Sequence, residues 1–175
     1  MTRGALLRAF GLAALAFLGA CGGSMGQAQS GSSGELVGAP APDFSLTPVD
    51  GGGAIGPKSF SGKVVIVDFW ATWCTPCKES FPAYQRLVDK FGGELVVVGV
   101  SVDDDPKGIA DFRAATGVKF PLVWDEGQVA ASVYKPGTMP TSFLLDRHGI
   151  VQFVHQGFRT GDATAIEEHV QTLLK

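Results

Sequence analysis

The chain has few of the residues that hold metals or covalent haem. Its only cysteines are Cys21, Cys74 and Cys77, and its three histidines show no metal-ligand spacing. Zinc bound by Cys74 and Cys77 would need two more ligands, normally a second close pair. Covalent haem would need a histidine directly after Cys77, where Lys78 stands. We therefore expect no metal and no cofactor.

The chain also lacks an excess of basic residues. Its 14 Lys and Arg residues are outnumbered by 17 Asp and Glu residues, which gives a formal net charge of −3 at pH 7. A nucleic-acid-binding domain usually carries a basic patch or stripe, so we expect no nucleic-acid partner. The 175 residues, 45% of them hydrophobic, are enough for one domain with a continuous core.

The apolar run near the start of the chain is too short to span a bilayer. It extends from Ala9 to Leu18 and follows Arg3 and Arg8, whereas a membrane-spanning helix needs about 20 apolar residues. A basic start, a short apolar run and small residues before a cleavage site are typical of a secretory signal peptide. We assign this role to residues 1–20.

The tetrad Leu18-Gly19-Ala20-Cys21 resembles the lipobox of bacterial lipoproteins, in which cleavage precedes a cysteine that receives diacylglycerol. The resemblance implies that lipid on Cys21 anchors the protein on the periplasmic side of a bacterial membrane. The alternative is a secreted protein with a free thiol. Gly, Ser, Gln and Ala then dominate up to Glu35, which favours a flexible linker. We therefore assign residues 21–36 to the lipidated cysteine and linker, and residues 37–175 to one domain.

Within this domain, apolar strands alternate with amphipathic helices. Segments 64–70 and 95–100 are rich in β-branched residues and predict buried strands. Residues 76–91 between them have the apolar spacing of an amphipathic helix. Further patterns predict a hairpin at 44–55, a helix capped by Asp105 and ended by Gly117, a short helix at 128–134, a strand pair at 141–155 and a last helix at 162–174. We expect an α/β fold, with a mixed sheet and helices on both faces.

Cys74 and Cys77 stand where the first buried strand leads into a helix. The free backbone N–H groups and the dipole at a helix N-terminus stabilise a thiolate, which is the attacking species in disulfide exchange. Cys77 lies almost one turn beyond Cys74 and is close enough to attack a mixed disulfide there. A purely structural disulfide across so small a loop would add little stability. The pattern favours redox exchange, with Cys74 as nucleophile and Cys77 as resolving cysteine.

The sequence Trp-Ala-Thr-Trp-Cys-Thr-Pro-Cys-Lys at 70–78, after a Val/Ile strand, resembles the thioredoxin superfamily. The opening segment 37–46 and the insert around 121–134 are similar to those of TlpA/ResA-like thiol-disulfide oxidoreductases and of the AhpC/TSA-type peroxiredoxins. This resemblance implies a thioredoxin-like fold with an added N-terminal hairpin and a central insert.

The resemblance also implies a docking surface for substrate. Residues 137–141, Gly-Thr-Met-Pro-Thr, match the cis-proline segment of the family. A cis Pro140 would then lie beside the cysteines, and the backbone of Met139 would pair with the extended substrate chain. Trp73, Thr75 and Pro76 are the other residues expected at this surface. The alternative for Pro140 is a proline that only begins a strand.

Asp68 is a carboxylate in an otherwise apolar strand, six residues before Cys74. Burial would raise its pKa. An aspartate at this place in thioredoxins relays a proton to or from the resolving cysteine, so the resemblance makes Asp68 the candidate acid/base for Cys77. The alternative is a carboxylate that is paired with a lysine such as Lys90 or that lies at a sheet edge. Many TlpA/ResA-like proteins instead have a neutral residue here and a glutamate at the position of Ser80, so this chain departs from them.

The resemblance implies an extracytoplasmic oxidoreductase that reduces disulfides in exported proteins, including apocytochrome c, with a membrane thiol-carrier protein as electron donor. The absence of histidine between the cysteines favours a reductase over an oxidase. One alternative is a thiol peroxidase, which would need a Pro and Thr at fixed spacing before its cysteine and an arginine to hold the peroxide. Another is a copper-binding chaperone, which would need a longer cysteine spacing and a distal ligand such as His148 or His155.

Overall fold

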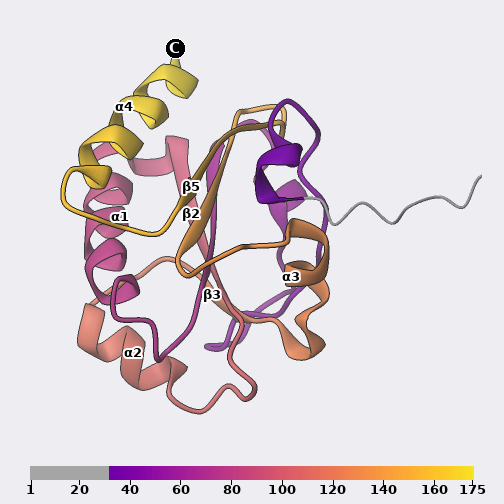
Figure 1. Ribbon diagram of the computed structural model, residues 1–175, viewed down its shortest axis with the longest axis vertical. Helices are drawn as coiled ribbons and strands as arrows, with labels where there is room; N and C mark the ends of the chain where they lie inside the picture. Colours follow the sequence, from indigo (N-terminus) through magenta and orange to yellow (C-terminus); the bar gives the residue numbers. More distant parts are fainter. Residues whose placement is uncertain (1–31) are drawn as a thin grey trace, which may run out of the picture.

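Five strands form one mixed sheet in this computed structural model, which describes residues 32–175 (Figure 1). The strands are β1 (Val64–Trp70), β2 (Leu95–Ser101), β3 (Leu122–Trp124), β4 (Thr141–Leu145) and β5 (Val151–Gln156), in the order β3-β2-β1-β4-β5. β1, β2 and β3 are parallel, whereas β4 runs antiparallel to both β1 and β5. The expected mixed sheet is confirmed, with β1 at its centre.

Helices cover both faces of the sheet, as predicted (Figure 1). The helices are α1 (Cys77–Phe91), α2 (Ile109–Thr116), α3 (Val129–Tyr134) and α4 (Asp162–Leu174), with short 3₁₀ helices η1 (Ser33–Leu36), η2 (Pro57–Phe60), η3 (Gly92–Glu94) and η4 (Glu126–Gln128). α1, α2 and α4 pack on one face, and α3 packs on the other with the N-terminal segment. No helix within residues 32–175 has the length and apolarity to span a membrane.

Every residue of β1 is buried because both faces of the strand are covered. Side chains alternate between the two faces of a strand. Ile66 and Trp70 therefore belong to the core beneath α1, whereas Val67 and Phe69 belong to the core beneath α3. Asp68 is the one carboxylate in this strand, and its place in the alternation directs it to the α1 side.

The expected N-terminal hairpin is reduced to a single bridge. Leu46 and Ile55 exchange two backbone hydrogen bonds of 3.0 and 2.9 Å, and Pro48 forms a bridge with Val123 of β3. Proline has no N–H to donate, so Pro48 limits a longer ladder in this segment. The segment crosses the α3 side of the sheet as a bridged loop rather than as two strands.

The folded unit begins earlier than residue 37, where we expected the domain to start. Ser33–Leu36 forms η1, Ser33 is buried, and its Oγ accepts a hydrogen bond of 2.8 Å from Gln156 of β5. The last residues of the predicted linker therefore pack on the domain. The predicted signal peptide, residues 1–20, and Cys21 lie outside the described residues.

The predicted start of α2 is also corrected. The helix begins at Ile109, and Asp105 does not cap it, because its carboxylate accepts the backbone N–H of Lys107 at 2.8 Å. Gly108 has a φ of 98°, a left-handed conformation that separates this turn from the helix. The end of α2 agrees with prediction, since Gly117 has a φ of 69° and its N–H bonds to the carbonyl of Arg113.

Candidate active site

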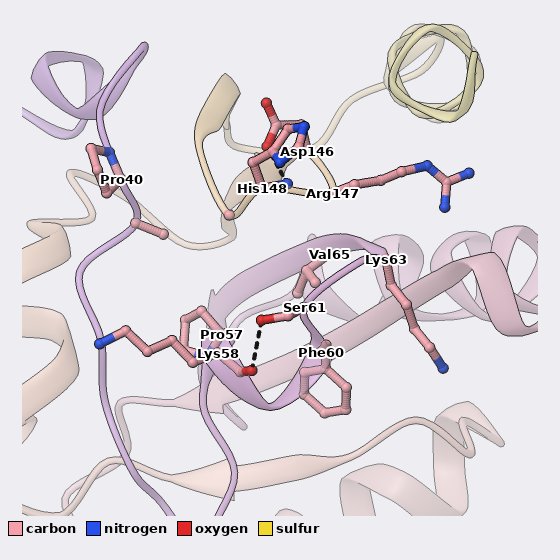
Figure 2. A pocket seen from close by; sticks show the side chains of 12 residues that line it. Pro40, Pro57, Lys58, Phe60, Ser61, Lys63, Val65, Asp146, Arg147 and His148 are labelled. Carbon is pink, nitrogen blue, oxygen red and sulfur yellow. Dashed lines mark hydrogen bonds between the residues drawn. The ribbon is translucent and has the colours of Figure 1, made fainter.

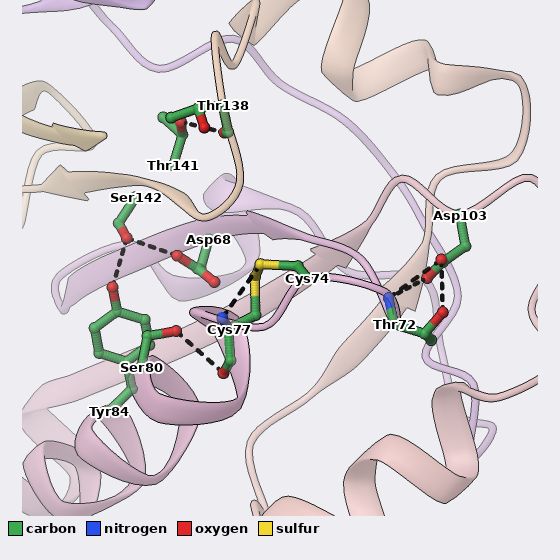
Figure 3. The surroundings of a disulfide bond; sticks show 10 residues. All are labelled: Asp68, Thr72, Cys74, Cys77, Ser80, Tyr84, Asp103, Thr138, Thr141 and Ser142. Carbon is green, nitrogen blue, oxygen red and sulfur yellow. Dashed lines mark hydrogen bonds between the residues drawn. A yellow bond between two sulfur atoms is a disulfide. The ribbon is translucent and has the colours of Figure 1, made fainter. Parts of the chain in front are cut away.

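Cys74 and Cys77 form a disulfide at the junction of β1 and α1 (Figure 3). Their Cα atoms are 5.3 Å apart, and the backbone N–H of Cys77, the first residue of α1, donates to Cys74 Sγ at 3.2 Å. Sulfur at Cys74 therefore already receives a hydrogen bond from the N-terminus of the helix. The same interaction would stabilise a thiolate at Cys74 after reduction.

The loop before Cys74 is held by a buried carboxylate that sequence reasoning did not select. Asp103 accepts hydrogen bonds from the backbone N–H and the hydroxyl of Thr72, at 3.0 and 2.8 Å, and from the hydroxyl of Ser101 at 2.7 Å. Thr72 and Asp103 are 31 residues apart in the chain, so no local pattern indicates their contact. Asp103 fixes the turn that leads from β1 to the cysteines.

The peptide bond between Met139 and Pro140 is cis, as expected. The loop that contains this bond faces the cysteine loop across an open pocket of about 450 Å³. The pocket is lined by Trp73, Cys74, Thr75 and Pro76 on one side and by residues 136–139 on the other. The structure thus brings Met139 and the docking residues predicted around Cys74 to one pocket, with Pro140 next in the chain.

The two cysteines differ in their access to this pocket. Cys74 is among the lining residues, whereas Cys77 is not and has no exposed surface. Trp73 is 69% exposed, an unusual exposure for so large an aromatic side chain. A partner entering the pocket would therefore meet Cys74 and Trp73 but not Cys77.

Asp68 is fully buried on the face of the sheet that carries the cysteines. It pairs with Ser142 across the β1–β4 register, and its Oδ1 accepts a hydrogen bond of 2.6 Å from the Ser142 hydroxyl. Its Oδ2 has no hydrogen-bond partner among the described residues. Burial raises the pKa of Asp68 to about 8, against the lowering effect of its hydrogen bonds. The direction predicted from the sequence is confirmed.

The alternative for Asp68, a pairing with Lys90, is wrong, because Lys90 forms an ion pair with Glu167 of α4 at the surface. Besides the hydroxyl of Ser142, the phenol oxygen of Tyr84 on α1 lies near Asp68, and this oxygen is 2.6 Å from Ser142 Oγ. The apolar spacing of residues 76–91 indicated only a packing role for Tyr84 in the predicted helix. The missed signal was its spacing, seven residues after Cys77, which puts both on one face of α1.

Ser80 is the residue at which the family resemblance led us to look for a glutamate. It is buried, and its hydroxyl donates to the carbonyl of Cys77 at 3.3 Å. The neighbouring Glu79 is exposed. Asp68 is thus the buried carboxylate on this side of the cysteine pair (Figure 3).

A second pocket lies at the opposite end of β1 and contains no cysteine (Figure 2). Its lining includes Lys58, Lys63, Arg147 and His148, together with Val65 near the start of the strand. His155 is not among the residues that line the cysteine pocket. Its Nε2 lies instead 2.9 Å from Nδ1 of His169, on α4. Neither histidine that copper binding would require lines the Cys74 pocket, and no arginine for peroxide binding lines it. Residues 32–175 hold no group of three or more potential metal ligands.

Comparisons with known proteins agree with this geometry. Residues 37–154 match the model of the AhpC/TSA family. The chain is 34% identical over 123 residues to the thioredoxin-like protein YneN of Bacillus subtilis, covering 69% of this chain and 71% of YneN. It is 32% identical over 138 residues to the thiol-disulfide oxidoreductase ResA of Geobacillus kaustophilus, covering 78% of each.

A solved structure is similar over most of the described chain. It is a putative thiol:disulfide interchange protein DsbE from Chlorobium tepidum, with a TM-score of 0.75 and 35% identity over 79% of this chain and 98% of that one. The fold, the Cys74–Cys77 pair and these relatives agree with one another. The chain belongs to the AhpC/TSA family within the thioredoxin superfamily, as a ResA-like thiol-disulfide oxidoreductase.

Proposed function

We propose that this enzyme reduces disulfide bonds in exported proteins, with Cys74 as the attacking cysteine and Cys77 as the resolving cysteine. The observation that carries the proposal is the unequal placement of the pair. Cys74 lines the open pocket and receives the N–H of Cys77, whereas Cys77 is sealed beneath it. Exchange with a bulky protein disulfide therefore begins at Cys74.

The reaction proceeds in two exchanges. The Cys74 thiolate attacks one sulfur of the substrate disulfide, so a mixed disulfide forms and the first substrate thiolate leaves and takes a proton from solvent. The thiolate of Cys77 then attacks Cys74 Sγ, which breaks the mixed disulfide, forms the Cys74–Cys77 disulfide and releases the second substrate thiolate. The substrate gains two electrons and the enzyme pair loses two.

Cys77 must lose a proton before it attacks, and Asp68 is our candidate for the base. Its carboxyl group is buried on the same face as Cys77, and its pKa of about 8 is suited to proton exchange near neutral pH. When an electron donor later reduces the pair, the same group returns the proton to Cys77 as it leaves Cys74.

The substrate chain docks between the cysteine loop and the cis-proline loop. Trp73, Thr75 and Pro76 form one wall, and Met139, before cis Pro140, belongs to the other. The openness of the pocket and the exposed indole of Trp73 support a protein substrate rather than an enclosed small molecule.

We place this reaction outside the cytoplasm, on the periplasmic side of a bacterial membrane, with lipid on Cys21 as the anchor. The signal-peptide pattern at 1–20 and the lipobox-like tetrad support this placement. A membrane thiol-carrier protein would supply electrons, and apocytochrome c before haem attachment is the substrate that the TlpA/ResA resemblance of the sequence implies.

The decisive test traps substrates on the full-length protein in its own cells. In the variant Cys77→Ser, Cys74 can form mixed disulfides that are not resolved, so protein partners should accumulate on it. Cys74→Ser is the matched control and should trap none. If the two variants trapped equal amounts of protein partners, the assignment of Cys74 as the attacking cysteine and Cys77 as the resolving cysteine would be contradicted.

The direction of the reaction is tested by the equilibrium reduction potential of the pair. A value near about −270 mV, as for thioredoxin, fits a reductase, whereas a value near about −120 mV would make the protein an oxidant of folding chains.

A further inference from the structure

A chain of hydrogen-bonded side chains leads away from Asp68, and the proposed reaction has not used it. Ser142 of β4 lies directly opposite Asp68 in the antiparallel register, so both side chains project from the same face of the sheet. Tyr84 reaches Ser142 from α1, and all three residues are buried. Figure 3 shows Ser142 between the carboxyl group of Asp68 and the phenol of Tyr84.

The direction of these hydrogen bonds follows from the number of protons. An ionised carboxylate can only accept, and Ser142 has one hydroxyl proton. When Asp68 is ionised, Ser142 must therefore donate to Oδ1 of Asp68, and Tyr84 must donate to Ser142. Burial and the nearby Asp68 raise the pKa of Tyr84 well above its ordinary value, so the phenol keeps the proton that it donates.

The two oxygens of Asp68 are consequently unequal. Oδ1 accepts the Ser142 hydroxyl at 2.6 Å, whereas Oδ2 has no hydrogen-bond partner among the residues described. An unpartnered buried oxygen is costly to keep, and such groups recur at sites with a chemical role. The face of Asp68 is also that of the core cluster containing Cys74 and Cys77.

We propose that Ser142 and Tyr84 are positioning residues that hold Oδ1 of Asp68 as a hydrogen-bond acceptor and leave Oδ2 to exchange a proton with Cys77. This role deepens the proposed function and rests on it. During substrate reduction the proton passes from Cys77 Sγ to Oδ2, and during reduction of the enzyme disulfide it returns. The hydrogen bonds of Ser142 and Tyr84 stabilise the carboxylate and bring its pKa down toward the working range.

Few other charged groups lie near the hydrogen-bonded side chains of Asp68, Ser142 and Tyr84. On β2 the residue paired with Asp68 is Gly99, which carries no charge. On β5 the residue paired with Ser142 is His155, which lies against His169 of α4. Asp162, at the start of α4, contributes to the raised pKa of Tyr84; at His155 it opposes the lowering of the pKa by burial and by His169, which prevails. We therefore expect a titration near pH 8 to come from Asp68 and not from His155, because burial lowers the pKa of that imidazole.

The test compares Ser142→Ala and Tyr84→Phe with the wild type and with Ser142→Thr, which keeps the hydroxyl. The first measurement is an infrared titration of the full-length oxidised protein, following the band of the protonated carboxyl group that Asp68→Asn removes. The second is a stopped-flow reaction of the reduced protein with 5,5′-dithiobis(2-nitrobenzoic acid). Release of the second thionitrobenzoate reports the attack of Cys77 on Cys74, and its rate is measured against pH.

Loss of the Ser142 hydroxyl should raise the midpoint of the infrared titration and the midpoint of the pH–rate profile by about one to two pH units. The reason is that the carboxylate loses a hydrogen bond, and hydrogen bonds to charged groups are strong. Tyr84→Phe should move them in the same direction by less, and Ser142→Thr should keep the wild-type midpoints. Because Tyr84→Phe removes a single oxygen, it carries the test if Ser142→Ala does not fold.

Unchanged midpoints in a folded Ser142→Ala or Tyr84→Phe variant would overturn the inference. An equal shift in Ser142→Thr would also overturn it, because the effect would then come from packing rather than from the hydroxyl. Neither measurement needs a protein substrate. If the expected shifts appear while Cys77→Ser traps no protein, the proposed function fails and the positioning role stands.

Discussion

At the scale of single residues, the buried carboxyl group of Asp68 makes stability depend on pH. Its pKa is about 8 in the folded protein and 3.8 in its ordinary state. Between these values the folded state binds more protons than the unfolded state, so the free energy of unfolding falls as the pH rises from about 4 to 8. A variant with a neutral side chain at this position would not show this decrease in the free energy of unfolding.

Asp68→Asn should therefore flatten the pH profile of stability. Between pH 5 and pH 8 we expect the free energy of unfolding of the wild type to fall by about 4 kcal/mol more than that of the variant, at 1.36 kcal/mol per pKa unit. Urea unfolding of both oxidised proteins at the two pH values measures the difference. Parallel profiles would show that the carboxyl group titrates near its ordinary pKa.

Asp103 is a second residue whose environment predicts a measurable effect. Asp103→Ala removes the acceptor for the N–H and hydroxyl of Thr72, so the turn before Cys74 loses its anchor. We expect a loss of about 1–3 kcal/mol in stability and slower attack by Cys74. Thermal unfolding and the rate of disulfide reduction measure the two effects.

The neighbouring Asp104→Ala provides the matched control, because Asp104 is exposed. It should leave both the melting temperature and the rate near those of the wild type. Similar losses in the two variants would mean that general charge in this loop matters rather than the Asp103–Thr72 contact.

At the scale of elements, the central strands could be predicted from their runs of β-branched residues, which are buried on both faces, and α1 from the helical spacing of its apolar residues. Local patterns failed at the start of α2 and in the N-terminal hairpin. In both places a specific hydrogen bond to the backbone sets the boundary. The carboxylate of Asp105 accepts the backbone N–H of Lys107 instead of capping the helix. In the opening loop, the backbone pairing is limited to Leu46 and Ile55.

The opening loop also contains a close backbone approach that only glycine permits. A Cβ atom at Gly56 would lie 1.9 Å from the carbonyl oxygen of Phe44. Gly56→Ala should thus displace the segment before η2 and lower the free energy of unfolding by about 1–3 kcal/mol. Gly53→Ala, where a Cβ would meet nothing within 4 Å, should have a much smaller effect in the same urea titration.

At the scale of the whole molecule, segments far apart in the chain form one docking surface beside the disulfide. Residues 73–76 follow β1, whereas residues 136–139 precede β4, and the pairing of these two strands brings both loops to the same pocket. The antiparallel register makes the end of β1 and the start of β4 neighbours. The sheet therefore positions Cys74 against the cis-proline loop.

Trp73→Ala tests this surface. Because the indole is 69% exposed, we expect stability to change by less than about 0.5 kcal/mol. Reduction of a protein disulfide should slow by about tenfold, the loss of one well-packed aromatic contact, while reaction with a small synthetic disulfide should change little. Val129→Ala, also at an exposed apolar residue, is the control, and equal slowing of both disulfides by Trp73→Ala would contradict a docking role.

The central strands, the strand pair at 141–155 and the helix that begins at the cysteines could be predicted from the sequence because each depends on local composition or spacing. A cis Pro140 could be predicted because residues 137–141 resemble a family motif, whereas the strand order and β3 could not. The sequence also indicated that burial raises the pKa of Asp68. The surroundings of these groups depend instead on contacts between residues far apart in the chain. Ser142 is 74 residues from Asp68 and 58 from Tyr84. Such contacts depend on strand register and on how α1 packs against the sheet, which local periodicity does not specify.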